Sequence, residues 1–376
     1  MKPWGPHEVR VPIDCKSGIY SFRCALADPP YVRDIPVIVR PVSDEKSSIA
    51  VLANTNTWNA YNFWASYDNT TGPHHGLARY DEEVVANSTL RLSFLRPNPF
   101  VLLDNPTPSN TELEPSQHLC RAELWFLCWM QMPEQQKGYG HVDIYSDHDL
   151  HSGTLRLDEY KVLILTTHPE YWSVAMYKKV REFLNAGKSV VYLGGNGIFD
   201  MVEFADDGKF MFAFGYYNQW PRTKQFTNIG LPEHLLLGDG INLVAGAMLD
   251  SVPYIVNPTQ LNHHPILQGV GQSIIGTNAW TIDPTGHVGA CGWEYDSLNT
   301  QEFPPPAVGG EVDVLAFGQN GSAAPFGCPT GQMIWYDHVG GGHVFSVGSI
   351  TFCSSLVIDR DLQTIFRNVM ETCLNG

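Results

Sequence analysis

The 376-residue sequence lacks both a long apolar run and a basic run. A membrane helix needs about 20 consecutive apolar residues, and no stretch approaches that length. The first ten residues, MKPWGPHEVR, have no apolar centre of the kind found in secretory signals, so we expect a soluble, cytoplasmic protein. The net charge is −16, and the 23 lysines and arginines form no cluster. The sequence therefore predicts neither a membrane nor a nucleic acid as a partner.

Paired cysteines and several common catalytic motifs are missing as well. The eight cysteines are scattered without a CxxC pair, so free thiols are expected rather than a structural zinc site. There is no GxSxG elbow and no glycine-rich phosphate loop with a lysine. LGGNG at 193–197 has glycines but not the full dinucleotide fingerprint. These absences argue against an α/β-hydrolase, a phosphate-loop NTPase and a dinucleotide-dependent enzyme.

The sequence contains two kinds of apolar segment: short continuous runs, and segments whose apolar residues have helical spacing. With 43% hydrophobic and 16% charged residues, the chain can bury a sizeable core. Continuous apolar runs of strand length predict buried parallel strands. These runs lie at 48–56, 141–147, 160–167, 188–196 and 343–351. Helical spacing predicts helices at 118–132, 173–187 and 354–374. Alternation of the two kinds predicts a doubly wound α/β fold.

The domain organisation follows from changes of pattern along the chain. Residues 1–48 predict an N-terminal β segment packed on the core, with an edge strand at 32–41 because of its prolines. Residues 49–376 predict one large α/β domain whose second half, from about 205, favours strands and turns. Residues 57–115 show no regular pattern, and so long a loop indicates either function or short elements that the pattern hides.

Polar and aromatic side chains follow four of the predicted strands. They are Thr57, Trp58 and Tyr61 after the first, Asp147, His148, Asp149 and His151 after the second, His168, Glu170, Tyr171 and Trp172 after the third, and Asn196 after the fourth. Because ligands bind at the carboxyl ends of parallel strands, we expect these side chains to share a crevice. For any single residue an alternative stays open, since exposed loops are polar, Asp149 can cap a turn and the aromatics can pack under a loop.

The side chains at this edge are carboxylates, phenols, imidazoles and an amide, without a cysteine after the third strand. Such groups suit a hard metal bound through oxygen or general acid–base chemistry on a carbonyl. Asn196 can orient a substrate or donate to a developing oxyanion. The residues alone leave these two kinds of chemistry open.

Nine pieces of the chain, in order, resemble the C-terminal half of the large subunit of N,N-dimethylformamidase and related proteins. They are SGIY (17–20), DIPVIVRP (34–41), NTWNAYNFW (56–64), LSFLRP (92–97), SDHDLH (146–151), YKVLIL (160–165), HPEYWS (168–173), YLGGNGIF (192–199) and GGGHVFSVGSI (340–350). The resemblance implies a flavodoxin-like or class I glutamine-amidotransferase-like parallel sheet with added β-rich segments.

The resemblance also implies an activity and a metal. The family's characterised member hydrolyses dimethylformamide to formate and dimethylamine, with one iron held by two tyrosines and one glutamate. Tyr61 of NAYN and Glu170 of HPEYW match two of these ligands, and the ion is expected to be Fe(III). His168 and Asn196 match groups that bind the substrate or orient the ligands, and Glu294 of GWEYD matches a further carboxylate.

The second tyrosine ligand departs from the family pattern. It is expected near the end of LSFLRP, where Asn98 and Pro99 stand instead. Tyr67, Tyr80 and Tyr171 are substitutes by their position in the sequence, and Tyr80 is taken as the ligand. Tyr171 ranks last, because in an extended segment it would point away from Glu170. Residues 62–115 also diverge from the family, which places substrate selection there.

Three functions agree with these observations. The first is a metal-dependent hydrolase of an amide or other C–N bond in a small molecule. The second is a metalloenzyme of the same architecture that oxidises or rearranges a metabolite, since an altered ligand set changes what iron can do. The third is a binding protein that has kept the fold and lost the metal. A homo-oligomer is expected on general grounds, and the acidic, tryptophan-rich composition leaves room for a small partner subunit.

Overall fold

A computed structural model describes residues 8, 10–27, 30–42, 46–62, 67–68, 72–73, 90–95, 118–205, 207–213, 225–241, 250–283, 285–298, 302–318 and 330–376. Its centre is a sheet of nine strands among these residues, ordered β15-β14-β17-β18-β19-β10-β8-β3-β7. Five neighbouring strands run parallel: β7 (Asp143–Ser146), β3 (Ile49–Ala53), β8 (Val162–Thr167), β10 (Ser189–Gly194) and β19 (His343–Ser346). Four antiparallel strands extend the sheet: β18 (Gln332–Asp337), β17 (Asp313–Gly318), β14 (Tyr254–Val256) and β15 (Ile274–Ile275).

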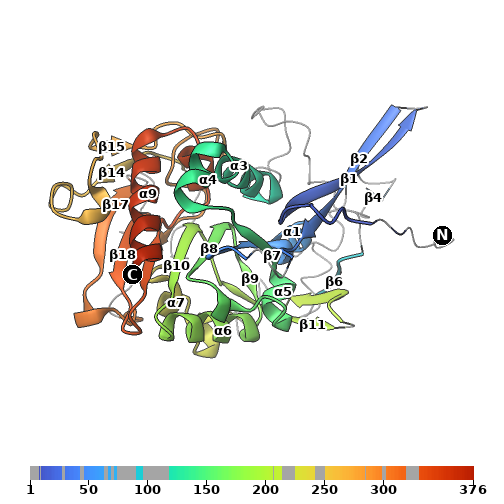
Figure 1. The fold of residues 1–376 in the computed structure, drawn as a ribbon, viewed down its shortest axis with the longest axis horizontal. Coiled ribbons are helices and arrows are strands. Elements are labelled where there is room, and N and C mark those ends of the chain that lie inside the picture. Colours follow the sequence, from blue (N-terminus) through green and yellow to red (C-terminus); the bar gives the residue numbers. More distant parts are fainter. Residues whose placement is uncertain are drawn as a thin grey trace.

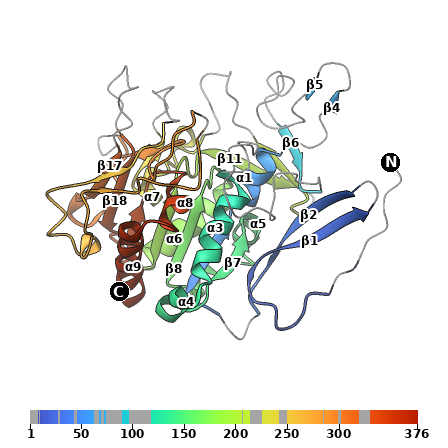
Figure 2. The same ribbon diagram turned by 90° about the horizontal axis from the view of Figure 1, so that it is seen from above.

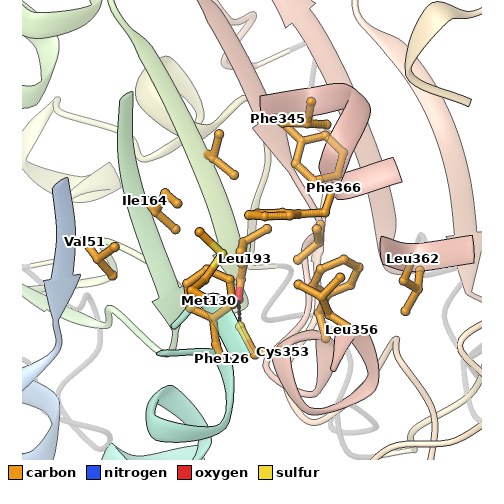
Figure 3. Close-up of a cluster of buried hydrophobic side chains, with 14 of the residues drawn as sticks. Val51, Phe126, Met130, Ile164, Leu193, Phe345, Cys353, Leu356, Leu362 and Phe366 are labelled. Carbon is orange, nitrogen blue, oxygen red and sulfur yellow. Dashed lines mark hydrogen bonds between the residues drawn. The ribbon is translucent and has the colours of Figure 1, made fainter. Parts of the chain in front are cut away.

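Helices cover both faces of this sheet (Figure 1). One face carries α3 (Cys120–Met130), α4 (Pro133–Tyr139) and α9 (Arg360–Asn375). The short helix α8 (Phe352–Leu356) packs into the same core as α3 and α9. The other carries α5 (Asp147–Ser152), α6 (Val174–Asn185) and α7 (His234–Leu237). Alternate strand residues point to opposite faces of the sheet. Val51 and Ile164 join the core between the sheet and helices α3 and α9 (Figure 3). Leu52 joins the core between the sheet and α6. The strands are therefore buried on both sides, which explains their continuous apolar runs.

Local signals set the ends of the long helices. The Ser173 hydroxyl accepts the Met176 N–H at the start of α6, and Gly187, with a φ of 78°, follows its end. Asp359 accepts the Leu362 N–H at the start of α9. These helices confirm two of the three predicted segments, with α8 and α9 sharing the segment at 354–374, and α3 confirms the third.

The five predicted parallel strands are confirmed as β3, β7, β8, β10 and β19. The closer likeness to a doubly wound glutamine-amidotransferase fold stays a prediction. The irregular segment predicted from residue 57 is wrong at its start, because α1 (Thr55–Ala60) forms there. Its N-terminus is held by a distant group, since the Asp147 carboxylate accepts the Asn56 N–H at 2.7 Å. A helix fixed by tertiary contact leaves little trace in an asparagine-rich sequence.

Smaller elements surround the main sheet. A four-stranded sheet consists of β6 (Leu90–Ser93), β12 (Phe210–Ala213), β11 (Asp200–Ala205) and β9 (Tyr171–Trp172). Two short pairs are β13 (Gly240–Ile241) with β16 (Asp296–Ser297), and β4 (Tyr67–Asp68) with β5 (Gly72–Pro73). Short 3₁₀ turns lie at Leu157–Glu159, Thr227–Ile229, Pro265–Leu267 and Val308–Gly310.

The N-terminal segment forms a hairpin of β1 (Gly18–Ala27) and β2 (Pro30–Val39). Figures 1 and 2 show it extending away from the main sheet. The strand predicted at 32–41 is thus present, but it pairs with β1 in a two-stranded sheet of its own. The base of the hairpin meets the core, where the Ser17 hydroxyl accepts the Ile144 N–H at 2.7 Å. Within the part of the chain that the structure describes, no helix combines the length and apolar character needed to span a bilayer.

Candidate active site

Three adjacent parallel strands deliver side chains to one edge of the sheet. β3 leads into α1, and Tyr61 directly follows this helix. β8 ends at Thr167, before His168 and Glu170, and β10 ends at Gly194, before Asn196. Because β10, β8 and β3 are neighbours, their carboxyl ends bring these groups together.

The side chains form one connected row. The Tyr61 hydroxyl donates to Glu170 Oε2 at 3.0 Å, and His168 Nε2 lies 3.3 Å from the same oxygen. On its other side, His168 Nε2 lies 3.1 Å from Glu294 Oε2, to which Asn196 Nδ2 donates at 2.9 Å. We call Glu170, His168 and Glu294 the carboxylate–imidazole row. The predicted residues Tyr61, His168, Glu170, Asn196 and Glu294 thus meet in one place.

Exposure differs along the carboxylate–imidazole row. The side chains of His168 and Glu170 are 2% and 1% exposed, whereas that of Glu294 is 19% exposed. Among the described residues, the row is therefore most exposed at Glu294. Two polar atoms near this end, His168 Nδ1 and Asn196 Oδ1, are buried and have no hydrogen-bond partner among the described residues. Buried polar atoms of this kind mark places where a ligand or water completes the bonding.

The charge of the site is set by its carboxylates. Burial lowers the pKa of the His168 imidazole, but the hydrogen bond and charge of Glu294 and the charges of Glu170 and Asp296 outweigh it. The net result is a pKa above the ordinary value for histidine. His168 is thus a proton donor that stays charged at higher pH than a free imidazole does.

Backbone strain is concentrated around the row. Thr167, Asn196, Trp293 and Glu294 all have positive φ angles, between 45° and 60°. Such conformations cost on the order of 1–3 kcal/mol each for non-glycine residues and gather at functional sites. A Cβ on Gly195 would lie 2.2 Å from the Glu294 carbonyl oxygen, so this glycine lets the Glu294 segment approach. LGGNG therefore serves close packing at the site, in agreement with its incomplete nucleotide fingerprint.

Over residues 2–364, the sequence matches the family described as N,N-dimethylformamidase beta subunit-like, C-terminal. The chain belongs to this family. The match confirms the resemblance seen in the sequence. Tyr61, His168, Glu170 and Asn196 all belong to motifs that carry this resemblance.

Two individual proteins are similar to this family member. The N,N-dimethylformamidase beta subunit of an Alcaligenes species is 28% identical over 131 residues, which are 35% of this chain and 16% of the relative. The chain thus matches about one sixth of that relative's length. A solved structure, the N-terminal domain of mmIFT52, is 13% identical, with a TM-score of 0.33. The match covers 66% of this chain and 90% of the mmIFT52 chain. A score this low does not assign a fold.

A second group of buried side chains lies against the row, and sequence reasoning missed it. The His118 ring packs between Tyr61, His168 and Trp293, with ring centroids 5.0, 5.3 and 4.5 Å away. Glu123, on α3, accepts the Trp58 indole N–H at 2.8 Å. One signal was available in the sequence, because α3 is apolar on almost all sides and a charged residue within such a helix is buried.

Glu123 gives the family member an expected dependence of stability on pH. Burial raises the pKa of Glu123 from 4.5 to about 8, and the hydrogen bonds from Trp58 and Asn54 offset this only in part. The folded protein therefore holds a proton that the unfolded chain has released, so the free energy of unfolding falls as pH rises. Between pH 6.5 and 8 we expect a loss of about 2 kcal/mol from this group. Glu233 and Asp296, with pKa values of about 7, act in the same direction.

Urea unfolding between pH 6.5 and 8 measures this slope. The measurement begins at pH 6.5 because burial lowers the pKa of His234 to about 4. Below pH 6.5 this histidine makes the free energy of unfolding rise with pH, which opposes the effect of Glu123. Glu123→Gln should flatten the slope, since a neutral amide no longer titrates. Glu311→Gln, at an exposed position, is the matched control. Equal slopes in the two variants would contradict the assignment.

The residues that follow the second predicted strand, β7, do not join the carboxylate–imidazole row. Asp149 closes the first turn of α5 by accepting the Ser146 N–H at 3.0 Å, and Asp147 holds the start of α1. His148 and His151 pack against the Phe204 ring. The capping role that stayed open for Asp149 is confirmed. Residues that follow three of the four predicted strands therefore form the site.

The metal ligands that the family resemblance implies stay a prediction. Tyr61 and Glu170 place two oxygen donors together in a buried position, as the prediction requires. Tyr80 and Asn98 lie outside the described residues. The Tyr171 ring lies 6.3 Å from the Tyr61 ring, edge to face. Among the described residues, no group of three or more His, Cys, Asp or Glu side chains is arranged to hold a metal.

Proposed function

We propose that this protein hydrolyses an amide or a related C–N bond in a small molecule. The observation that carries the proposal is the carboxylate–imidazole row, with Asn196 beside it and partial exposure at Glu294. Membership of the dimethylformamidase beta subunit-like family supports the same reaction class. The 28% identical relative is named for its action on dimethylformamide, and small formamides are therefore the first substrates to test.

The residues of the row divide the proton transfers of hydrolysis between them. Water adds its oxygen to the carbonyl carbon, the C–N bond breaks, and the amine leaves with an added proton. Glu294, the exposed end of the row, accepts the proton of the attacking water. His168, whose pKa is raised, delivers a proton to the departing nitrogen. Asn196 Nδ2 donates to Glu294 Oε2 at 2.9 Å and so holds this carboxylate in place.

We include iron, as Fe(III), in the proposal. A phenol and a carboxylate 3.0 Å apart are hard oxygen donors that suit this ion, so Tyr61 and Glu170 would hold it. Tyr80 stays the predicted third donor. When bound, iron would supply Lewis-acid polarisation of the carbonyl oxygen. Because the relative is named a beta subunit, the proposal also includes a partner subunit for this chain.

Incubation with a panel of formamides and acetamides, N,N-dimethylformamide among them, tests the reaction. Release of carboxylate and amine in equal amounts is the expected result, with one oxygen of the carboxylate taken from labelled water. Iron content and a visible tyrosinate band, lost in Tyr61→Phe, test the ligand set. Oxygen consumption without amine release would replace the proposal by an oxidation. No turnover by iron-reconstituted protein would remove it.

A further inference from the structure

Asp296 lies directly behind the site and uses both carboxylate oxygens. It is fully buried at the start of β16, where it pairs with Ile241. Its Oδ1 accepts the backbone N–H of Asn196 at 2.9 Å, and its Oδ2 accepts the Tyr192 hydroxyl at 2.8 Å. Neither of the proton transfers described above uses this side chain.

The conformation of Asn196 needs the support of a hydrogen bond such as the one that its backbone N–H donates to Asp296. The Asn196 backbone is left-handed, with a φ of 51°, a conformation that asparagine tolerates but does not prefer. Its side-chain amide must meet Glu294 at 2.9 Å, and it lies 3.5 Å from His168 Nε2. The Asn196 backbone thus binds Asp296 while its side chain binds Glu294, two residues earlier. One asparagine joins the 294–296 segment to the end of β10 at two points.

We propose that Asp296 is a positioning residue: its carboxylate fixes the backbone of Asn196, and through it the approach of Asn196 and Glu294 to His168. The strained angle of Glu294, with a φ of 60°, lies within the segment held in this way. A change in the Asp296 contact therefore moves two members of the site together. The effect on turnover rests on the proposed function, whereas the effect on the geometry of Asn196 does not.

The neighbouring carboxyl group of Asp239 offers a comparison that distinguishes the positioning of Asn196 from the mere burial of a negative charge. Asp239 is also fully buried, but its oxygens accept the Ser346 hydroxyl at 2.8 and 2.6 Å. Burial raises the pKa of both carboxyl groups; the charge of Asp296 raises the pKa of Asp239 further, and the charge of Glu294 does so for Asp296. Loss of either carboxylate thus removes a buried negative charge, and of the two only Asp296 adds to the raised pKa of His168. Only Asp296 carries the contact with Asn196 described above.

Three variants form the test. Asp296→Leu keeps the branched shape without an acceptor, and we expect kcat to fall by about 100-fold with a smaller change in KM, as a small misplacement of catalytic groups produces. Asp296→Asn keeps an oxygen for the Asn196 N–H, and its amide can donate to the Tyr192 oxygen, so most of kcat should return. Asp239→Asn, the matched control, should stay within about threefold of wild type, since surplus buried charge is removed without loss of the Asn196 contact.

Crystal structures of the same variants give a readout that needs no substrate. In Asp296→Leu, Asn196 should leave the left-handed region and its bond to Glu294 should break; in Asp296→Asn both should persist. If Asp296→Leu does not fold, Asp296→Ala takes its place. Wild-type geometry in the folded variant, or equal losses in Asp296→Asn or Asp239→Asn, would overturn the proposal. If the wild-type protein hydrolyses no amide, the proposed function fails, and the crystal structures still decide the role of Asp296.

Discussion

Replacing Glu170 by glutamine is expected to lower kcat by about 10³-fold on the amide that the wild-type protein hydrolyses best. Glu170 is almost fully buried, and a single oxygen, Oε2, accepts the Tyr61 hydroxyl and faces His168. Glutamine keeps the shape but loses the charge, and its amide nitrogen cannot accept a hydrogen bond. Because the Glu170 charge also helps to raise the pKa of His168, the variant has a weaker proton donor as well.

Steady-state kinetics with thermal unfolding and iron content measure this change. The loss should appear in kcat/KM as well as in kcat, since the interaction belongs to the reacting site. Glu203→Gln is the matched control, because Glu203 lies exposed on β11; its kcat should match the wild type. A Glu170→Gln variant that folds and retains more than one tenth of kcat would exclude Glu170 from the chemistry.

Much of this site follows from the sequence for one physical reason. Parallel strands buried on both faces appear as continuous apolar runs, and whatever follows them lies at one edge of the sheet. Tyr61, His168 and Asn196 are predictable in this way, since each follows such a run. Glu294 was reached only through the resemblance, because it precedes a strand of two residues that no pattern marks.

The remaining parts of the site depend on contacts between distant segments. Glu123 is buried because Trp58 and Asn54, more than 60 residues earlier, donate to it. The role of Asp296 arises from Asn196, 100 residues away in sequence. The positive φ angles of Thr167 and Trp293 contradict the preference of both residue types, and only the surrounding packing enforces them. Local pattern marks Glu123 as buried, but pattern and propensity do not identify the distant partners of Glu123 or Asn196.

Replacing His168 by glutamine is the second substitution for which we expect a large effect, a fall in kcat of about 10²- to 10⁴-fold. Glutamine can still donate a hydrogen bond to Glu170 or Glu294, but it cannot carry the proton to the leaving nitrogen. The two carboxylates hold the His168 pKa above its ordinary value, so the active, charged form persists to higher pH than it does in a free imidazole. On the alkaline side, wild-type kcat should therefore fall as pH rises through this raised pKa.

The pH profile of kcat, from about pH 5 to 10, distinguishes proton transfer from packing. In His168→Gln the alkaline fall assigned to the imidazole should vanish, leaving a low and nearly flat rate, since glutamine does not titrate. The matched control is His343→Gln, because His343 also pairs with a carboxylate, Asp337, at 2.8 Å, but lies at the start of β19, away from the row. That variant should keep both the rate and the alkaline fall. If His168→Gln lowers kcat and retains the alkaline fall, then another group titrates in turnover, and the imidazole serves only to hold Glu170 and Glu294 apart.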